Sequence, residues 1–231
     1  MRVIGLLGGM SWESTVEYYR IINQEVRRRL GRQHSARLLL YSVDFEEIDR
    51  LQGEDKWSAA GDQLAAAAKR LERARADFIL MCTNTMHKVA DQIESELGVP
   101  LIHIADATAE RVREAGVGKI GLLGTRFTMG EDFYRGRLRE RHGLQVMVPP
   151  QQDRALVDRV IYDELCQGII DEGSRREFVR IIADLGESGA EGVILGCTEI
   201  GLLVSRADSP IPAFDTTRIH AEKGVGLALE V

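Results

Sequence analysis

The sequence predicts an α/β protein made of two similar lobes, and three internal matches carry that prediction. Residues 4–8 (IGLLG) recur as residues 120–124 (IGLLG), an offset of 116 positions. Residues 78–85 and 193–199 are both apolar runs that stop in Cys-Thr, and Cys82 and Cys197 are 115 positions apart. Residues 100–106 resemble residues 210–215. These matches indicate an internal duplication with one half-site in each half.

We expect each lobe to be a mostly parallel four-stranded sheet flanked by helices. The first lobe takes residues 1–105, completed by residues 210–231, and the second takes residues 106–209. Uninterrupted apolar runs such as residues 193–196 are typical of parallel strands that are covered on both faces. Ligands of such sheets bind beyond the carboxyl ends of the strands, so we expect the active site in a cleft between the lobes.

In the first lobe, glycines, prolines and apolar runs divide the chain into strands and helices. Strands are predicted at residues 2–7, 38–43, 78–81 and 100–105. Residues 8–15 predict a glycine turn into a helix that Ser11 or Ser14 can cap, with free N–H groups that favour a carboxylate. Further helices are predicted at the alanine-rich residues 59–75, at 87–97 and at 108–115, and a loop at 44–52.

The second lobe repeats this plan. Strands are predicted at residues 119–123, 144–148, at the run that ends before Cys197, and at 210–214. Helices are predicted at residues 153–166, 174–187 and 216–229. Residues 124–129 predict an exit loop with two hydroxyls, at the position that residues 8–11 occupy in the first lobe.

Composition limits the partners and the compartment. The 231 residues are 44% hydrophobic, which is enough for a proper core. Thirty basic and thirty-six acidic residues give a net charge of −6 with scattered basic residues, so we expect no nucleic acid partner. No apolar run approaches the ~20 residues of a membrane span, so we expect no membrane contact. Three cysteines without a CxxC pair, and no signal-like start, predict a cytoplasmic protein with reduced thiols.

Thiol, hydroxyl and amide groups are what the sequence places at predicted strand ends. The histidines and cysteines show no metal-ligand spacing, the glycine turn at residues 8–15 is neither GxGxxG nor GxxxxGK[ST], and the hydrolase motifs GxSxG and HExxH are absent. We therefore expect no metal and no cofactor. A lone cysteine is more often core filler, but a set of polar groups can hold a carboxylate while a thiolate acts on the neighbouring carbon. The set is Thr83, Asn84, Thr85, Thr125, Thr128, Cys197 and Thr198.

Four motifs resemble the aspartate/glutamate racemase family of cofactor-independent amino-acid racemases: IGLLGGMSWEST, CTNTMH, GLLGTRFTM and GCTEIGLL. The resemblance runs over essentially the whole chain. It implies a pseudo-symmetric two-lobed fold, a homodimer, and an acidic amino acid as the small-molecule substrate between the lobes. In this family two cysteines on opposite faces of the substrate exchange the α-proton, and Cys197 matches the second of them.

The first catalytic position departs from the family pattern. The family motif is Cys-Asn-Thr, whereas Thr83 precedes Asn84 here and Cys82 lies one place earlier. Side chains alternate along an extended segment, so only one of the two faces the cleft. We expect Thr83, because the Asn-Thr pair grips the substrate in the family; Cys82 is the alternative. A threonine hydroxyl is a far weaker acid than a thiol of pKa about 8.5. We therefore expect the two catalytic positions to differ in reactivity, with a preference for one enantiomer.

Other residues in the family motifs or nearby loops are expected to bind the two carboxylates of the substrate. They are Met10, Gln52, Asn84, Thr85, Thr125, Thr198 and Glu199. Glu199 has two further interpretations, as a residue that tunes Cys197 or as an ordinary acid at a helix N-terminus. His87 and His103 either support the site from behind or are satisfied core residues.

Two other functions stay open at this point. Arylmalonate decarboxylases of the same superfamily keep only the second cysteine, which protonates an enediolate after carbon dioxide leaves. The third interpretation is a non-catalytic module that binds an acidic amino acid, and it predicts that Cys197→Ser keeps binding.

Overall fold

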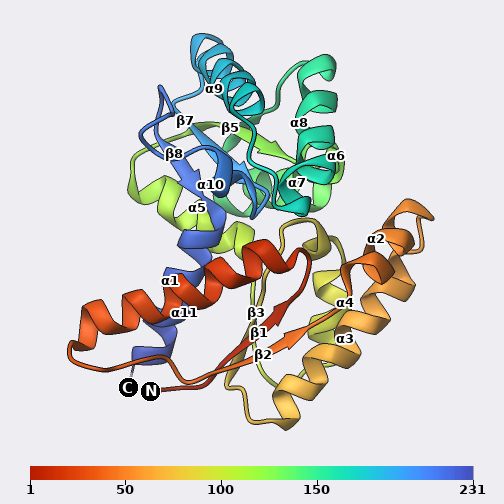
Figure 1. Ribbon diagram of the computed structural model, residues 1–231, viewed down its shortest axis with the longest axis vertical. Coiled ribbons are helices and arrows are strands. Elements are labelled where there is room, and N and C mark those ends of the chain that lie inside the picture. The colour runs from red at the N-terminus through yellow and green to blue at the C-terminus, as the bar shows by residue number, and fades with distance from the viewer. Residues whose placement is uncertain (231) are drawn as a thin grey trace. The chain divides into compact units, whose positions relative to one another are not determined.

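The structure is a computed structural model that describes residues 1–230. The chain divides into two compact units (Figure 1). Unit 1 contains residues 1–104 and the segment from His220 onward, and unit 2 contains residues 105–219. Each unit holds one four-stranded, all-parallel sheet with helices beside it, which confirms the predicted fold class. The segment that returns to unit 1 begins at His220, ten residues after the predicted position 210.

The sheet of unit 1 has the strand order β2-β1-β3-β4. Its strands are β1 (Ile4–Gly8), β2 (Leu38–Ser42), β3 (Phe78–Met81) and β4 (Leu101–Ile102). The helices are α1 (Trp12–Leu30), α2 (Phe45–Gly53), α3 (Trp57–Arg73), the 3₁₀ turn η1 (Thr85–Val89), α4 (Ala90–Ser95) and most of α11 (Thr216–Leu229).

Side-chain alternation along β1 and β3 divides the core of unit 1 into two layers. Leu6, Leu80 and Cys82 belong to the layer packed with α1 and α11. Leu7 and Met81 belong to the layer packed with α2, α3 and α4. Figure 1 shows α2, α3 and α4 gathered on one side of this sheet. Whether a side chain at the end of β3 belongs to one layer or the other therefore depends on whether its position number is even or odd.

Unit 2 repeats the arrangement with the strand order β6-β5-β7-β8. Its strands are β5 (Lys119–Gly124), β6 (Gln145–Met147), β7 (Gly192–Gly196) and β8 (Ala213–Asp215). Its helices are most of α5 (Ile104–Glu114), α6 (Arg126–Gly130), α7 (Asp132–His142), α8 (Gln151–Asp163), the 3₁₀ turn η2 (Leu165–Gln167), α9 (Glu172–Glu187) and α10 (Ile200–Leu203). Leu123 and Leu195 pack in the layer formed with α8 and α9.

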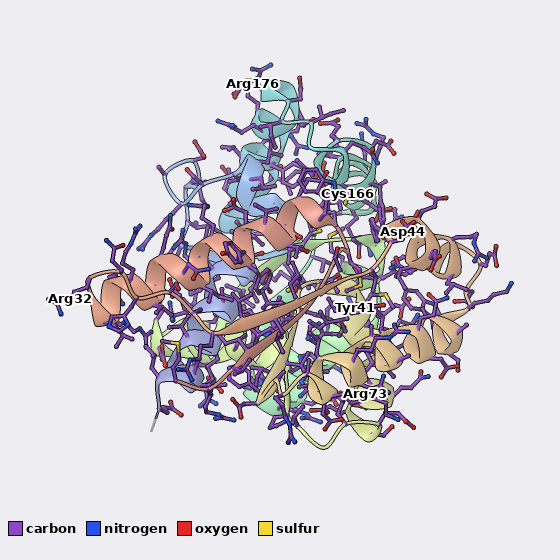
Figure 2. All side chains as sticks on the ribbon, turned by 60° about the horizontal axis from the view of Figure 1, so that its bottom comes forward. Arg32, Tyr41, Asp44, Arg73, Cys166 and Arg176 are labelled. Atoms are coloured by element: carbon purple, nitrogen blue, oxygen red, sulfur yellow. The ribbon has the colours of Figure 1, made fainter. Side chains whose placement is uncertain are left out.

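Two predicted loops are helices in the structure. Residues 44–52 form α2, because Ile48, Leu51 and Gln52 bury one face of it and Asp44 caps it by accepting the Glu46 N–H at 3.1 Å. Asp44 is labelled before that helix in Figure 2. Residues 124–129 were expected as an exit loop, but Gly124 ends β5, Thr125 caps α6, and residues 126–129 lie in that helix. The strand predicted at 100–105 is shortened to β4, since α5 already begins at Ile104.

The surface carries dispersed charges. Figure 2 shows Arg32, Arg73 and Arg176 at separate places on the outside of the chain, and all three are exposed. Within residues 1–230, no helix combines the length and the apolar character that crossing a membrane requires. The same residues contain no group of three or more His, Cys, Asp and Glu arranged to hold a metal ion.

Candidate active site

Cys82 lies inside the core of unit 1. It is fully buried in the layer packed with α1 and α11, and its thiol points back to the Leu80 carbonyl with a sulfur–oxygen distance of 3.7 Å. Burial raises the pKa of this thiol. Its apolar surroundings in this layer are typical of a structural cysteine.

The strand register shows which residue of unit 1 is equivalent to Cys197. Leu7 of the first IGLLG run pairs with Met81, and Leu123 of the second run pairs with Leu195. Cys197 follows Leu195 by two residues, and the residue two places after Met81 is Thr83. Thr83 and Cys197 therefore occupy equivalent positions in the two sheets. The sequence offset of 115, which aligns Cys82 with Cys197, is wrong by one residue, because Cys82 is equivalent to Gly196.

Local backbone contacts fix Thr83 just past the end of β3. Its N–H donates to the Met81 carbonyl at 2.9 Å, and its own carbonyl accepts from His87 Nδ1 at 2.8 Å. Thr83 is 6% exposed and Asn84 2%. Thr85 begins η1, whose next residue, Met86, accepts a hydrogen bond from Gln52 Nε2 at 3.1 Å. Four predicted positions of unit 1, Gln52, Thr83, Asn84 and Thr85, thus belong to one buried, contiguous region.

In unit 2, Cys197 forms a tight pair with a carboxylate. Its thiol donates to Glu199 Oε2 at 2.8 Å, and the Thr198 hydroxyl donates to the same oxygen at 3.0 Å. Cys197 is 8% exposed and Glu199 1%. Burial and, after it, the negative charge of Glu199 raise the pKa of the Cys197 thiol well above its ordinary value. In the absence of other charges the sulfur is therefore a protonated thiol with a proton acceptor already in contact.

Two hydroxyls that the sequence did not single out hold the end of β7. Thr216 Oγ1 donates to the Leu195 carbonyl at 2.8 Å, and Thr217 Oγ1 donates to the Thr198 carbonyl at 3.1 Å. Both threonines begin α11, directly after β8, the strand that neighbours β7. In the sequence, these two threonines stand at the start of a predicted helix, and hydroxyl residues at that position are usually interpreted as helix caps. Their contacts fix the backbone on both sides of Cys197.

The remaining predicted positions lie at other strand ends. Thr125 follows β5, the neighbour of β7, and caps α6 by accepting the Thr128 N–H at 3.3 Å. Met10 is buried in the layer packed with α2, α3 and α4. Ser11 stands at the N-cap of α1 without a side-chain capping bond, and instead its carbonyl accepts from the hydroxyls of Ser14 and Thr15.

The fold and these half-sites define an α/β protein with a strand-end hydroxyl in one unit and a thiol–carboxylate pair at the equivalent strand end of the other. Residues 7–224 match the family model described as Asp/Glu/hydantoin racemase. The chain belongs to this family, which confirms the resemblance that the motifs indicated.

Three relatives extend over the whole chain. A crystal structure of a candidate Asp/Glu racemase from Yersinia pestis is 55% identical, covers 100% of both chains and superposes with a TM-score of 0.92. A crystal structure of an aspartate racemase homologue from Pyrococcus horikoshii OT3 is 38% identical, also with full coverage of both chains, at a TM-score of 0.86. The broad specificity amino-acid racemase RacX of Bacillus subtilis is 23% identical over 98% of each chain. Racemases are isomerases, so the relatives place the chain among enzymes of that class.

Proposed function

We propose that this protein is a cofactor-independent racemase of aspartate or glutamate in which Cys197 and Thr83 act on opposite faces of the α-carbon. The observation that carries the proposal is the strand register, which makes Thr83 and Cys197 equivalent positions of the duplicated fold. Buried hydroxyl and amide groups beside each of them, at Asn84, Thr85 and Thr198, bind the carboxylates of the substrate.

Cys197 works as the base for one enantiomer. When the substrate is bound, the Cys197 proton passes to the Glu199 carboxylate, the ammonium group of the substrate stabilises the resulting thiolate, and the thiolate takes the α-proton. Thr83 then delivers a proton to the opposite face, directly or through a water molecule. Glu199 releases its proton to solvent and Thr83 regains one from solvent, which restores the starting state. Because an alcohol is a much weaker acid than a thiol, inversion through Thr83 is slower than return of the proton from Cys197.

Exchange of the α-proton in deuterated buffer, followed by NMR together with the enantiomeric composition, tests the proposal. The substrates are L- and D-aspartate and L- and D-glutamate. The wild-type protein exchanges and inverts at least one pair. Cys197→Ser lowers both rates by at least about a hundredfold, the range of general acid–base catalysis. Thr83→Ala loses inversion but keeps exchange with retention, and the matched control Cys82→Ser keeps both.

Other outcomes would replace the proposal. Loss of both rates in Cys82→Ser alone would make Cys82 the partner of Cys197. No α-proton exchange on any substrate would reject the racemase, and carbon dioxide release from an arylmalonate would then support the single-cysteine decarboxylase. Binding of an acidic amino acid without exchange, unchanged in Cys197→Ser, would support a binding module.

A further inference from the structure

His87 lies behind Thr83 and is held in one protonation state by two backbone groups. It is 3% exposed. Its Nδ1 is 2.8 Å from the Thr83 carbonyl, which can only accept, so Nδ1 carries a proton. Its Nε2 accepts the Ile104 N–H at 3.2 Å, so Nε2 carries none. The ring is therefore neutral, with a single tautomer set by its partners.

The two bonds connect the ends of neighbouring strands. Thr83 follows β3, Ile104 follows β4, and β3 pairs with β4 in the sheet. The Ile104 N–H is at the start of α5, where no intrahelical acceptor exists, and His87 satisfies it. The His87 ring also packs on His103, with 4.4 Å between centroids. His87 thus links β3 and β4 at the edge of the sheet that carries Thr83.

Thr83 depends on this link because the strand ladder does not hold it. Strand β3 ends at Met81, and the Thr83 N–H turns back to the Met81 carbonyl. The plane of the peptide between Thr83 and Asn84 is set by the bond from His87 Nδ1 to the carbonyl of Thr83. Rotation of that plane would move the side chains on both sides of it. Cys197 belongs to the other unit.

We propose that His87 is a positioning residue that orients the Thr83 hydroxyl for proton delivery, and that it acts on inversion and not on the chemistry of Cys197. This inference rests on the proposed function, because it assigns His87 to one of the two half-reactions. Misplacement of a reacting group by about 1 Å costs up to about a hundredfold in rate. Loss of the Nδ1 donor therefore lowers inversion while exchange with retention at Cys197 persists.

His87→Asn and His87→Gln form a matched pair that tests the inference. The Asn amide nitrogen replaces Nδ1 and keeps a donor for the Thr83 carbonyl, whereas the longer Gln amide reaches the place of Nε2 and leaves that carbonyl without one. Both variants are assayed in deuterated buffer for exchange with retention and for inversion. We expect Asn to invert at near the wild-type rate, and Gln to lose about tenfold to a hundredfold of inversion with exchange and KM within about threefold.

Equal inversion rates in the Asn and Gln variants would overturn the inference, as would a parallel loss of inversion and exchange in Gln. Thermal unfolding of each variant identifies a folding defect, and a Gln variant that does not fold while Asn is fully active would make His87 a structural residue. Absence of α-proton exchange in the wild-type protein is a separate result that rejects the proposed function itself.

Discussion

At the scale of single residues, the proposed mechanism depends on the contact between Cys197 and Glu199. A thiol whose pKa is raised by burial and by a neighbouring carboxylate is a poor base unless the proton has somewhere to go. The 2.8 Å contact from the Cys197 thiol to Glu199 supplies that acceptor inside the protein. The same carboxylate that disfavours the free thiolate thus provides a route to it.

Glu199→Gln separates these two effects. The amide keeps the shape of the side chain but neither takes the proton nor repels a thiolate, so the pKa of Cys197 falls while its internal base is lost. We expect kcat/KM at pH 7 to fall by about a hundredfold and then to rise with pH, as hydroxide or buffer replaces Glu199. The wild-type rate, which relies on internal transfer, changes less over the same range. The measurement is α-proton exchange between pH 6 and 9.

A matched change at the neighbouring hydroxyl controls this experiment. Thr198→Val removes the hydroxyl that donates to Glu199 Oε2 and leaves the carboxylate in place. Its pH profile should keep the wild-type shape. A Glu199→Gln variant with unchanged activity at pH 7 would show that Glu199 does not accept the thiol proton.

At the scale of secondary-structure elements, a buried histidine connects α11 to α1 and β4. His220 Nε2 donates to the Ile102 carbonyl at 2.8 Å, so its Nδ1 accepts from the Tyr18 hydroxyl, also at 2.8 Å. Burial lowers the pKa of His220 to about 4. The neutral ring is the form that satisfies both partners, and a second proton would remove the acceptor for Tyr18.

This histidine makes stability depend on pH. The unfolded chain binds a proton at His220 below about pH 6.5 and the folded chain does so only below about pH 4, so the free energy of unfolding falls as pH drops through that window. The full effect is at most about 3 kcal/mol. Urea unfolding at pH 7.5 and pH 5 measures this change in the free energy of unfolding. The difference between wild type and His220→Gln separates the contribution of His220 from those of His87 and His103.

The expected outcome is that His220→Gln is less stable at pH 7.5, because its amide fits the two partners less well, and that the deficit shrinks at pH 5. A deficit that is the same at both pH values would contradict a lowered pKa for His220. Tyr18→Phe is the companion variant, since it removes the hydroxyl bonded to Nδ1 and leaves the buried ring.

Elements with strong apolar patterns were predictable from sequence, and charged ones were not. Strand β3 and helix α11 have the predicted bounds, because one is a continuous apolar run and the other starts at a Thr pair after a strand. Helix α7 was missed, since only Tyr134, Gly136 and Leu138 of its eleven residues are buried and the rest is largely charged. A pattern of so few apolar positions does not separate a helix from a loop.

The composition of the candidate site was predictable from sequence, whereas its strand register followed from a family motif and not from the internal offset. Motif spacing placed Thr83, Asn84, Cys197 and Thr198 at strand ends, where the structure has them. The Asn-Thr motif favoured Thr83 over Cys82, whereas the offset along the chain favoured Cys82, because an offset reports the strand register only to within a residue. The pairing of β3 with β1, a long-range property, makes Thr83 the equivalent of Cys197. The contact between Cys197 and Glu199 depends on the turn after β7, which no periodic pattern encodes.

At the scale of the whole molecule, exposed apolar side chains form a stripe along α1. Trp12, Val16 and Tyr19 are 64%, 51% and 54% exposed and lie on one face, at the spacing of successive helical turns. Large aromatic side chains are enriched in protein interfaces and are costly to leave in water. Glu17 and Arg20, on the same helix, form an ion pair with each other. Their charges therefore do not repel the same helix of a second copy.

We predict a homodimer in which the α1 stripes of two copies meet in an isologous interface. The double change Trp12→Ser with Tyr19→Ser removes two aromatic anchors, each worth about 2 kcal/mol at the centre of an interface, so the dimer dissociation constant rises by roughly three orders of magnitude. Sedimentation velocity over a concentration series measures it. Ile169→Ser with Ile170→Ser is the matched control, because these side chains are also exposed, at 51% and 42%, and lie in unit 2. A monomeric wild type would reject the dimer, and an unchanged constant in the α1 variant would move its interface elsewhere.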